Sequence, residues 1–213
     1  MKPKIIPLDY WTASDRTELY ATLQQGQVIA YPTDTIYGLG VDVYHPGAVA
    51  SLQRMKGRDS QKPISILYSS TERMLKDFNH LNDFQLSAVR ALLPGSVTLL
   101  LPVKSEEQFP APFTHNGIVG IRVINLPALN ALLSDYPNPI STTSINPADQ
   151  EPACSPVGIQ NYFSSEISII IDNGFTGNIQ ASTIIKVLED GWKIIRVGVL
   201  SNTSVDIILK SLK

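Results

Sequence analysis

The sequence predicts an α/β fold with a mixed sheet. Apolar segments of strand length alternate along the chain with segments whose apolar residues recur at helical spacing. Late in the chain, the apolar segments 182–188 and 192–197 flank Asp190-Gly191, a pair favoured in hairpin turns. Such a hairpin adds antiparallel pairing to the alternating pattern. Because no internal repeat, low-complexity tract or linker stands out, residues 1–213 are expected to form one domain.

The elements of the first half follow from capping residues and apolar periodicity. Ile5 and Ile6 predict a first strand, and Thr12 or Ser14 is placed to cap a helix that runs to about Gln25 and ends at Gly26. The elements expected next are a strand at 28–30, a helix at 46–55 with Gly57 as its C-terminal cap, a strand at 64–68, and two capped helices at 69–78 and 82–93.

The second half predicts the same alternation. Residues 103–117 have no clear period and are interpreted as a long surface loop, a kind of segment that is usually functional or mobile. The remaining elements are expected as strands at 97–101, 118–124, 140–143 and 167–171, helices at 126–133 and 157–163, the hairpin, and a closing amphipathic helix over 205–212.

Composition narrows the class of protein. With 43% hydrophobic and 17% charged residues, the chain has the composition of a soluble globular protein long enough to bury a core. A net charge of −2 gives no global sign of nucleic-acid binding. A single cysteine, Cys154, excludes an internal disulfide and a cysteine-rich zinc site. With no apolar segment of signal-peptide or membrane-spanning length, we expect a cytoplasmic protein that does not enter a membrane.

One stretch, residues 31–62, carries the strongest functional pattern. Pro32 ends a buried strand, so the side chains of residues 33–35 are expected to be free to bind something small. Lys56 and Arg58 flank the predicted helix cap at Gly57, and Lys62 follows closely. Hydroxyls on one loop and cations on the next suit a ligand that carries phosphate or carboxylate. The structural alternative is that the cations only complement the helix dipole and that Thr33-Asp34-Thr35 is ordinary turn chemistry.

The motifs of the chain also resemble a known family. The matching segments, in order, are Tyr31-Pro-Thr-Asp-Thr-Ile-Tyr-Gly-Leu-Gly40, Lys56-Gly-Arg58, Pro94-Gly-Ser-Val-Thr98, Ile121-Arg-Val123, Thr143-Ser-Ile-Asn146, Ala181-Ser-Thr183 and Arg196-Val-Gly198. In this order and spacing they resemble the YrdC/TsaC family, the L-threonylcarbamoyladenylate synthases. The resemblance runs from about residue 10 to about residue 200, and its paired Lys-x-Arg and Ser-x-Asn signature is specific in this context.

The resemblance implies a fold and a reaction. The fold would be a YrdC-like twisted, open mixed sheet with flanking helices and a concave cationic cleft, without the second domain of longer relatives. The reaction would join L-threonine, bicarbonate (or carbon dioxide) and ATP, with Mg²⁺ offsetting the triphosphate charge, to give threonylcarbamoyl-AMP and pyrophosphate. Partner proteins would then transfer the threonylcarbamoyl group to adenosine 37 of tRNA.

The resemblance also implies roles for individual residues. Lys56 and Arg58 would be catalytic, acting with Lys62 on the triphosphate, because the reaction needs positioning and charge stabilisation rather than an enzyme nucleophile. Residues matching threonine contacts are Thr35, Arg122 and Ser182, and residues matching nucleotide contacts are Ser144, Asn146 and Arg196. No metal ligand is assigned to a protein side chain.

Each of these residues also has a structural alternative. Arg122 lies in an apolar strand and needs a partner, which could be a carboxylate such as Asp42 or Asp172 rather than a ligand. Arg196 could be a solvated cation at a strand end, while Ser144 and Asn146 could cap a turn.

Several positions depart from the family pattern and keep rival functions open. Asp59 follows the Lys-x-Arg motif, Ile145 interrupts Ser-x-Asn, Pro147-Ala-Asp149 replaces a small flexible pair, and Lys186 stands where aspartate is common. These departures favour, as the alternative, a YciO-type paralogue that binds double-stranded RNA or tRNA with little or altered adenylation activity. A third candidate is a carbamoyl-AMP-forming activity like that of hydrogenase-maturation proteins.

Overall fold

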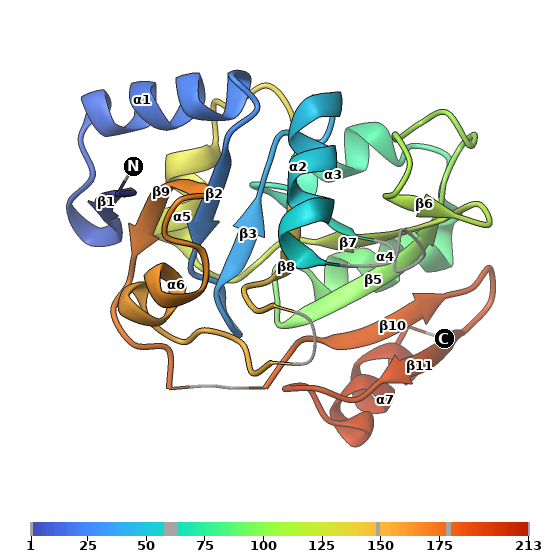
Figure 1. Ribbon diagram of the computed structural model, residues 1–213. Coiled ribbons are helices and arrows are strands. Elements are labelled where there is room, and N and C mark those ends of the chain that lie inside the picture. Colours follow the sequence, from blue (N-terminus) through green and yellow to red (C-terminus); the bar gives the residue numbers. More distant parts are fainter. Residues whose placement is uncertain (1, 58–63, 148–149, 178–179, 213) are drawn as a thin grey trace.

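The computed structural model describes residues 2–57, 64–147, 150–177 and 180–212 (Figure 1). Within these residues one continuous sheet runs in the order β1-β9-β2-β3-β8-β4-β7-β5-β10-β11, with the short strand β6 paired to β7. Four of the pairings are parallel (β1 with β9, β2 with β9, β4 with β7, β5 with β10) and the others are antiparallel. The predicted mixed α/β sheet is confirmed.

The strands have the following bounds: β1 Lys4–Pro7, β2 Val28–Tyr31, β3 Gly38–Gly40, β4 Ser65–Leu67, β5 Val97–Pro102, β6 Thr114–His115, β7 Ile118–Arg122, β8 Ile140–Ser144, β9 Ile167–Asp172, β10 Thr183–Val187 and β11 Trp192–Arg196. The predicted hairpin is β10 and β11. The predicted loop at 103–117 is interrupted by β6 and is not wholly a surface loop, because Phe109 and Phe113 are buried in the core.

The helices are η1 Leu8–Tyr10, α1 Ala13–Gln24, α2 Pro46–Lys56, α3 Thr71–Asp77, α4 Asp83–Leu92, α5 Pro127–Leu133, α6 Pro156–Phe163 and α7 Asn202–Lys210. Local capping explains their bounds. Thr12 and Asn82 form capping boxes with Asp15 and Gln85, as the sequence predicts for α1 and α4. Gly57 ends α2 in the left-handed conformation. None of the helices in the described ranges is long and apolar enough to cross a membrane.

The sheet is buried on both faces along β2. Along β2, Val28 and Ala30 belong to the larger hydrophobic core, whereas Ile29 and Tyr31 belong to a second core together with residues of α1 and α5. Alternate side chains of a strand point to opposite faces, so β2 must be covered twice. Residues of α2 contribute to the first of these cores and residues of α1 and α5 to the second.

Candidate active site

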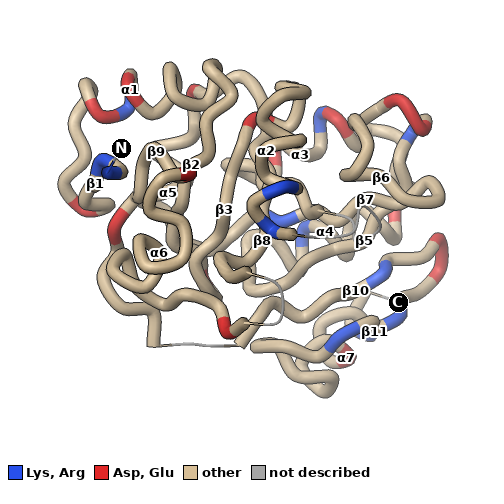
Figure 2. Tube along the Cα trace, viewed as in Figure 1, with Lys and Arg blue, Asp and Glu red and all other residues tan. Residues whose placement is uncertain are grey.

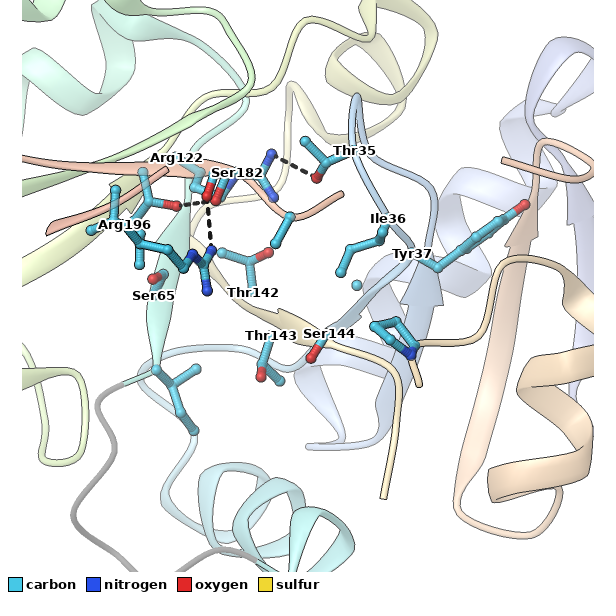
Figure 3. A pocket seen from close by; sticks show the side chains of 16 residues that line it. Thr35, Ile36, Tyr37, Ser65, Arg122, Thr142, Thr143, Ser144, Ser182 and Arg196 are labelled. Atoms are coloured by element: carbon cyan, nitrogen blue, oxygen red, sulfur yellow. Dashed lines mark hydrogen bonds between the residues drawn. The ribbon is translucent and has the colours of Figure 1, made fainter. Parts of the chain in front are cut away.

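A cavity of about 350 Å³ opens on the sheet where β3, β8, β4, β7, β5 and β10 meet. Figure 3 shows polar side chains from several strands around this space. The residues that line it are Thr35, Ile36, Tyr37, Gly38, Ile64, Ser65, Thr98, Arg122, Thr142, Thr143, Ser144, Pro152, Ala181, Ser182, Ile184 and Arg196. Two guanidinium groups and several hydroxyls therefore share one cavity.

The loop between β2 and β3 presents Thr35 to the cavity. Thr33 fixes this loop: its Oγ1 accepts a hydrogen bond from the Thr35 backbone N–H at 3.0 Å and lies 2.6 Å from the Ile36 carbonyl oxygen, to which it can donate. Thr33 and Thr35 are both buried. The expectation that the side chains of residues 33–35 are free is therefore wrong for Thr33, whose hydroxyl is bonded within its own turn, and for Asp34, which is ion-paired with Arg122.

Arg122 at the end of β7 is a buried cation held by Asp34. Its Nη2 donates to Asp34 Oδ1 at 2.7 Å and to Thr35 Oγ1 at 3.3 Å, and both ion-pair side chains are only 8% exposed. Asp34 in turn accepts the backbone N–H of Asn125 at 3.1 Å. Nε of Arg122 is buried with no hydrogen-bond partner within the described residues. The ion pair thus fixes a guanidinium that lines the cavity and whose Nε donor is unused within the described residues.

Burial and the neighbouring charges together set the pKa of Arg122. Burial lowers the pKa of its guanidinium, the carboxylate of Asp34 raises it, and the positive charge of Arg196 lowers it further. The two guanidiniums share one cavity, so their positive charges repel each other. An anion bound between them would relieve that repulsion.

Across the cavity, Ser182 lies between Thr98 and Arg196. Its hydroxyl is 2.8 Å from Thr98 Oγ1, and its carbonyl oxygen accepts Arg196 Nη2 at 2.8 Å (Figure 3). A β-bulge sets the direction of Arg196: Ile185 pairs with Ile194 and Ile184 with Arg196, so Ile195 is an extra residue on β11. Ile184 and Arg196 consequently both point to the cavity face of the sheet. Without the extra residue, strict alternation would have placed Arg196 on the same face as Ile194, away from the cavity.

Two glycines allow the close packing around this site. A Cβ on Gly120, in β7, would lie 2.7 Å from Ser65 Oγ, beside the side chain of Thr98. A Cβ on Gly198 would lie 2.1 Å from the Ala181 carbonyl oxygen, which belongs to the segment that carries Ser182. Real Cβ atoms do not approach backbone atoms so closely, so Gly198 is required where the chain leaves β11 and passes β10.

A second group of predicted residues lies where α2 ends beside the end of β8. The Lys56 side chain is almost fully buried, and its Nζ donates to the Ser144 carbonyl oxygen at 2.6 Å, the Asn146 carbonyl oxygen at 2.8 Å and Asn146 Oδ1 at 2.9 Å. Asn146 Oδ1 also accepts the Ser144 hydroxyl at 2.6 Å. The Asn146 amide nitrogen donates to the Pro147 and Gln150 carbonyl oxygens. We call Lys56, Ser144 and Asn146 the lysine corner.

The structure brings most of the predicted site residues to one cavity. Thr35, Arg122, Ser144, Ser182 and Arg196 all line it, while Lys56 and Asn146 lie behind its wall in the lysine corner. We call Arg122 and Arg196 the arginine pair. The predicted residues Arg58, Lys62 and Asp59 lie outside the described residues. The binding and catalytic roles of all these residues stay predictions.

The partner suggested for Arg122 from the sequence was wrong. Asp42 instead accepts hydrogen bonds from the Tyr136 hydroxyl at 2.6 Å and the Asn138 amide at 2.8 Å. Asp172 accepts the backbone N–H of Gly174 at 2.7 Å. Both carboxylates are therefore used locally, and the ion pair of Arg122 is made by Asp34.

Sequence reasoning assigned no role to Thr98 or Ser65, and it expected a free side chain at Asp34 rather than an ion pair with Arg122. Asp34 is 88 residues from Arg122 in the chain, and Thr98 is 84 residues from Ser182. The only sequence signal for Asp34 and Thr98 was that they lie in the matching segments Tyr31–Gly40 and Pro94–Thr98. Sequence reasoning also gave no role to His45, whose Nδ1 accepts the Ala48 backbone N–H and caps α2.

Comparison with known proteins identifies relatives of this chain. The Sua5/YciO/YrdC family model, described as telomere recombination, matches residues 21–198. A threonylcarbamoyl-AMP synthase of Saccharophagus degradans is 31% identical over 183 residues, which are 85% of this chain and 95% of the relative. A threonylcarbamoyl-AMP synthase of Cellvibrio japonicus is 30% identical over 171 residues, 78% of this chain and 88% of the relative.

Solved structures show the same fold. A double mutant of P. abyssi Sua5 superposes with a TM-score of 0.86 at 25% identity, over 96% of this chain and 63% of that protein. This chain thus spans less than two thirds of that longer protein. E. coli YciO superposes with a TM-score of 0.79 at 22% identity, over 93% of this chain and 97% of YciO. From the matched family model, the matched relatives and the shared fold, the chain belongs to the Sua5/YciO/YrdC family.

Proposed function

We propose that this chain condenses L-threonine, bicarbonate (or carbon dioxide) and ATP into threonylcarbamoyl-AMP and releases pyrophosphate. Its relatives at 30–31% identity carry the name of that activity. The observation that carries the proposal is the cavity in which two guanidiniums, Arg122 and Arg196, lie beside the hydroxyls of Thr35, Ser182 and others. A site for two anionic substrates requires this combination of fixed cations and hydroxyl groups.

L-Threonine would bind beside Arg122. A guanidinium favours a carboxylate because planar donors match two oxygens, and Nε of Arg122 is buried without a partner within the described part of the chain. Asp34 already holds the guanidinium in place, so binding of threonine would cost little side-chain entropy at Arg122. The hydroxyls of Thr35 and Ser182 are then available to orient the amino acid in the same cavity.

The reaction needs no enzyme nucleophile. The threonine amine adds to bicarbonate with loss of water and forms a carbamate. A carbamate oxygen then attacks the α-phosphorus of ATP, the bond from that phosphorus to the bridging oxygen breaks, and pyrophosphate leaves. The protein contributes the alignment of the two substrates and cations near the phosphorus, where negative charge increases.

The nucleotide would occupy the Arg196 and Ser144 side of the cavity. Because Lys56 donates to the backbone and side chain of residues 144 and 146, it would act by positioning this wall. Arg58 and Lys62, outside the described residues, stay predicted triphosphate contacts. Within the described residues no three His, Cys, Asp or Glu side chains form a metal group, so Mg²⁺ would be held mainly by the phosphates, whose charge it offsets.

In the cell, the product would serve N6-threonylcarbamoyladenosine formation at position 37 of tRNA. Partner proteins would carry out the transfer, and the whole chain would act as a single cytoplasmic domain. This wider context comes from the family relationship. It does not follow from the geometry of the cavity.

The direct test is pyrophosphate release from ATP with bicarbonate, measured with and without L-threonine, together with detection of threonylcarbamoyl-AMP by mass spectrometry. We expect release that depends on threonine and matches the product in amount. Absence of release from a folded protein that binds ATP would contradict the proposal and favour a YciO-type paralogue. Release with carbamoyl phosphate in place of threonine would instead favour the carbamoyl-AMP-forming activity.

A further inference from the structure

Two lysines face each other directly on the β10–β11 hairpin. The strand register pairs Lys186 with Lys193, and Lys186 is half-buried while Lys193 is exposed. Like charges directly opposite each other on antiparallel strands are destabilising. The pair therefore does not stabilise the hairpin, and it places two cations side by side on one face of it.

No carboxylate of the described residues neutralises this lysine pair. The ion pairs in the described part of the chain involve the cations Lys4, Arg16, Arg122 and Lys210. Glu189 and Asp190 follow β10 in the connection of the same hairpin, yet neither forms an ion pair with Lys186 or Lys193. Figure 2 shows the resulting basic residues on β10 and β11. The hairpin thus presents two cations that have no ion-pair partner among the described residues.

The lysine pair lies on the cavity face of the sheet. Alternation along β10 puts Lys186 on the same face as Ile184, which lines the cavity. The register and the bulge put Lys193 and Arg196 on that face of β11 as well. Arg122, Arg196 and the lysine pair therefore form a series of cations that runs from the buried centre of the cavity toward the edge of the sheet.

We propose that Lys186 and Lys193 bind the terminal phosphates of the nucleotide whose reacting end lies in the cavity. The ligand class is a polyphosphate: a carboxylate or a single phosphate is matched by the arginine pair alone, whereas a chain of phosphates extends charge outward along the series. Each lysine adds a compact, mobile ammonium with three donors, which suits a phosphate chain that changes on cleavage. This inference rests on the proposed function for the identity of the nucleotide.

The test measures binding rather than turnover, by titration calorimetry on the full chain with ATP, AMP, inorganic tripolyphosphate and tRNA. The variant is Lys186→Gln/Lys193→Gln, and the charge-matched control is Lys2→Gln/Lys76→Gln, with one site preceding β1 at the opposite edge of the sheet and one on α3. We expect the hairpin variant to bind ATP and tripolyphosphate about tenfold more weakly than wild type, since two cations are lost from a half-exposed site. AMP binding should change less than twofold, and the control should bind as wild type.

Folding of the variant is checked by its unfolding midpoint, which should not fall because a repulsive pair is removed. Equal weakening of ATP binding and AMP binding in the variant would overturn the proposal. So would unchanged binding of ATP and tripolyphosphate in the variant, or a wild-type protein that binds neither of them. Weakening of tRNA alone would assign the lysine pair to nucleic-acid phosphates and also overturn it. If the variant weakens tripolyphosphate but wild type shows no threonine-dependent pyrophosphate release, the proposed function fails while this subsite stands.

Discussion

The arginine pair and the lysine corner were both predicted from basic residues in the matching motifs, yet their side chains have different surroundings in the structure. Arg122 and Arg196 line the cavity, and Nε of Arg122 is buried without a partner in the described part of the chain. In the lysine corner, three oxygens of Ser144 and Asn146 lie within 2.9 Å of the Lys56 ammonium nitrogen. Basic residues of the motifs therefore line the cavity in one place and hold its wall in another.

This difference separates two kinds of mutational effect. Removing a cation that faces a ligand weakens binding and catalysis while the fold stays intact. Removing a cation that is hydrogen-bonded to buried backbone oxygens leaves those oxygens without donors and lowers the free energy of unfolding. Arg122 belongs to both classes, because it lines the cavity and is also ion-paired to Asp34.

The largest expected effect is that of Arg122→Ala. It should reduce threonine-dependent pyrophosphate release at least about 100-fold through loss of a fixed charge. It should also lower the free energy of unfolding by about 3–5 kcal/mol, because the buried carboxylate of Asp34 is left unpaired. Steady-state kinetics and urea unfolding measure the two losses separately.

Arg122→Lys is the matched control for that experiment. It restores a positive charge beside Asp34 but removes the planar fork, so most of the stability should return while activity stays low. Full recovery of activity would show that a point charge is enough and would contradict bidentate binding of the threonine carboxylate.

Arg196→Gln should show the opposite balance. Arg196 is exposed and donates a hydrogen bond to the Ser182 carbonyl oxygen. The free energy of unfolding should therefore change by less than about 0.5 kcal/mol. Turnover should nevertheless fall about 100-fold, since the cation near the developing charge is lost. Arg54→Gln, an exposed arginine on α2, is the charge-matched control and should turn over as wild type. If the Arg196 variant turned over as wild type, Arg196 would have no role in the reaction and would be only a solvated cation at a strand end.

Lys56→Met tests the lysine corner. Methionine fills a similar volume but cannot donate, so the carbonyl oxygens of Ser144 and Asn146 lose a charged donor. We expect the free energy of unfolding to fall by about 1.5–3 kcal/mol. We also expect a higher KM for ATP, because the cavity wall carrying Ser144 is no longer held. A variant with unchanged stability and lost turnover would make Lys56 a direct substrate contact, as the sequence predicted.

Most of the fold could be predicted from local signals. The caps of α1, α2 and α4 depend on residues within four positions of each other, so the sequence displays them directly. β3 was missed, because Gly38–Gly40 has the composition of a loop. Its strand conformation depends on pairing with β2 and with the distant β8, and a Cβ on Gly40 would clash with the ring of Tyr31. Distant pairing overrides local propensity there.

The site was predictable as a set of residues but not as a set of contacts. Thr35, Arg122, Ser144, Ser182 and Arg196 were named from their motifs and do line one cavity. Their partners were not predictable, because register and bulges bring together residues far apart in the chain. The direction of Arg196 depends on one extra residue in β11, which no local pattern indicates.

The smallest expected effect concerns a residue for which the sequence suggested no role. Thr98→Val keeps the side-chain shape but removes the hydroxyl that lies 2.8 Å from Ser182 Oγ. Loss of one buried hydrogen bond should cost about 1 kcal/mol of unfolding free energy. If Ser182 contacts threonine through an oriented hydroxyl, the KM for threonine should rise about fivefold while the KM for ATP stays unchanged, an effect of about the same energy. Thr98→Ser is the control, since it keeps the hydroxyl and should retain the wild-type KM. Equal changes in both KM values would show instead that Thr98 supports the whole cavity, and the distinction between ligand-facing and wall-holding residues would then fail on this side of the site.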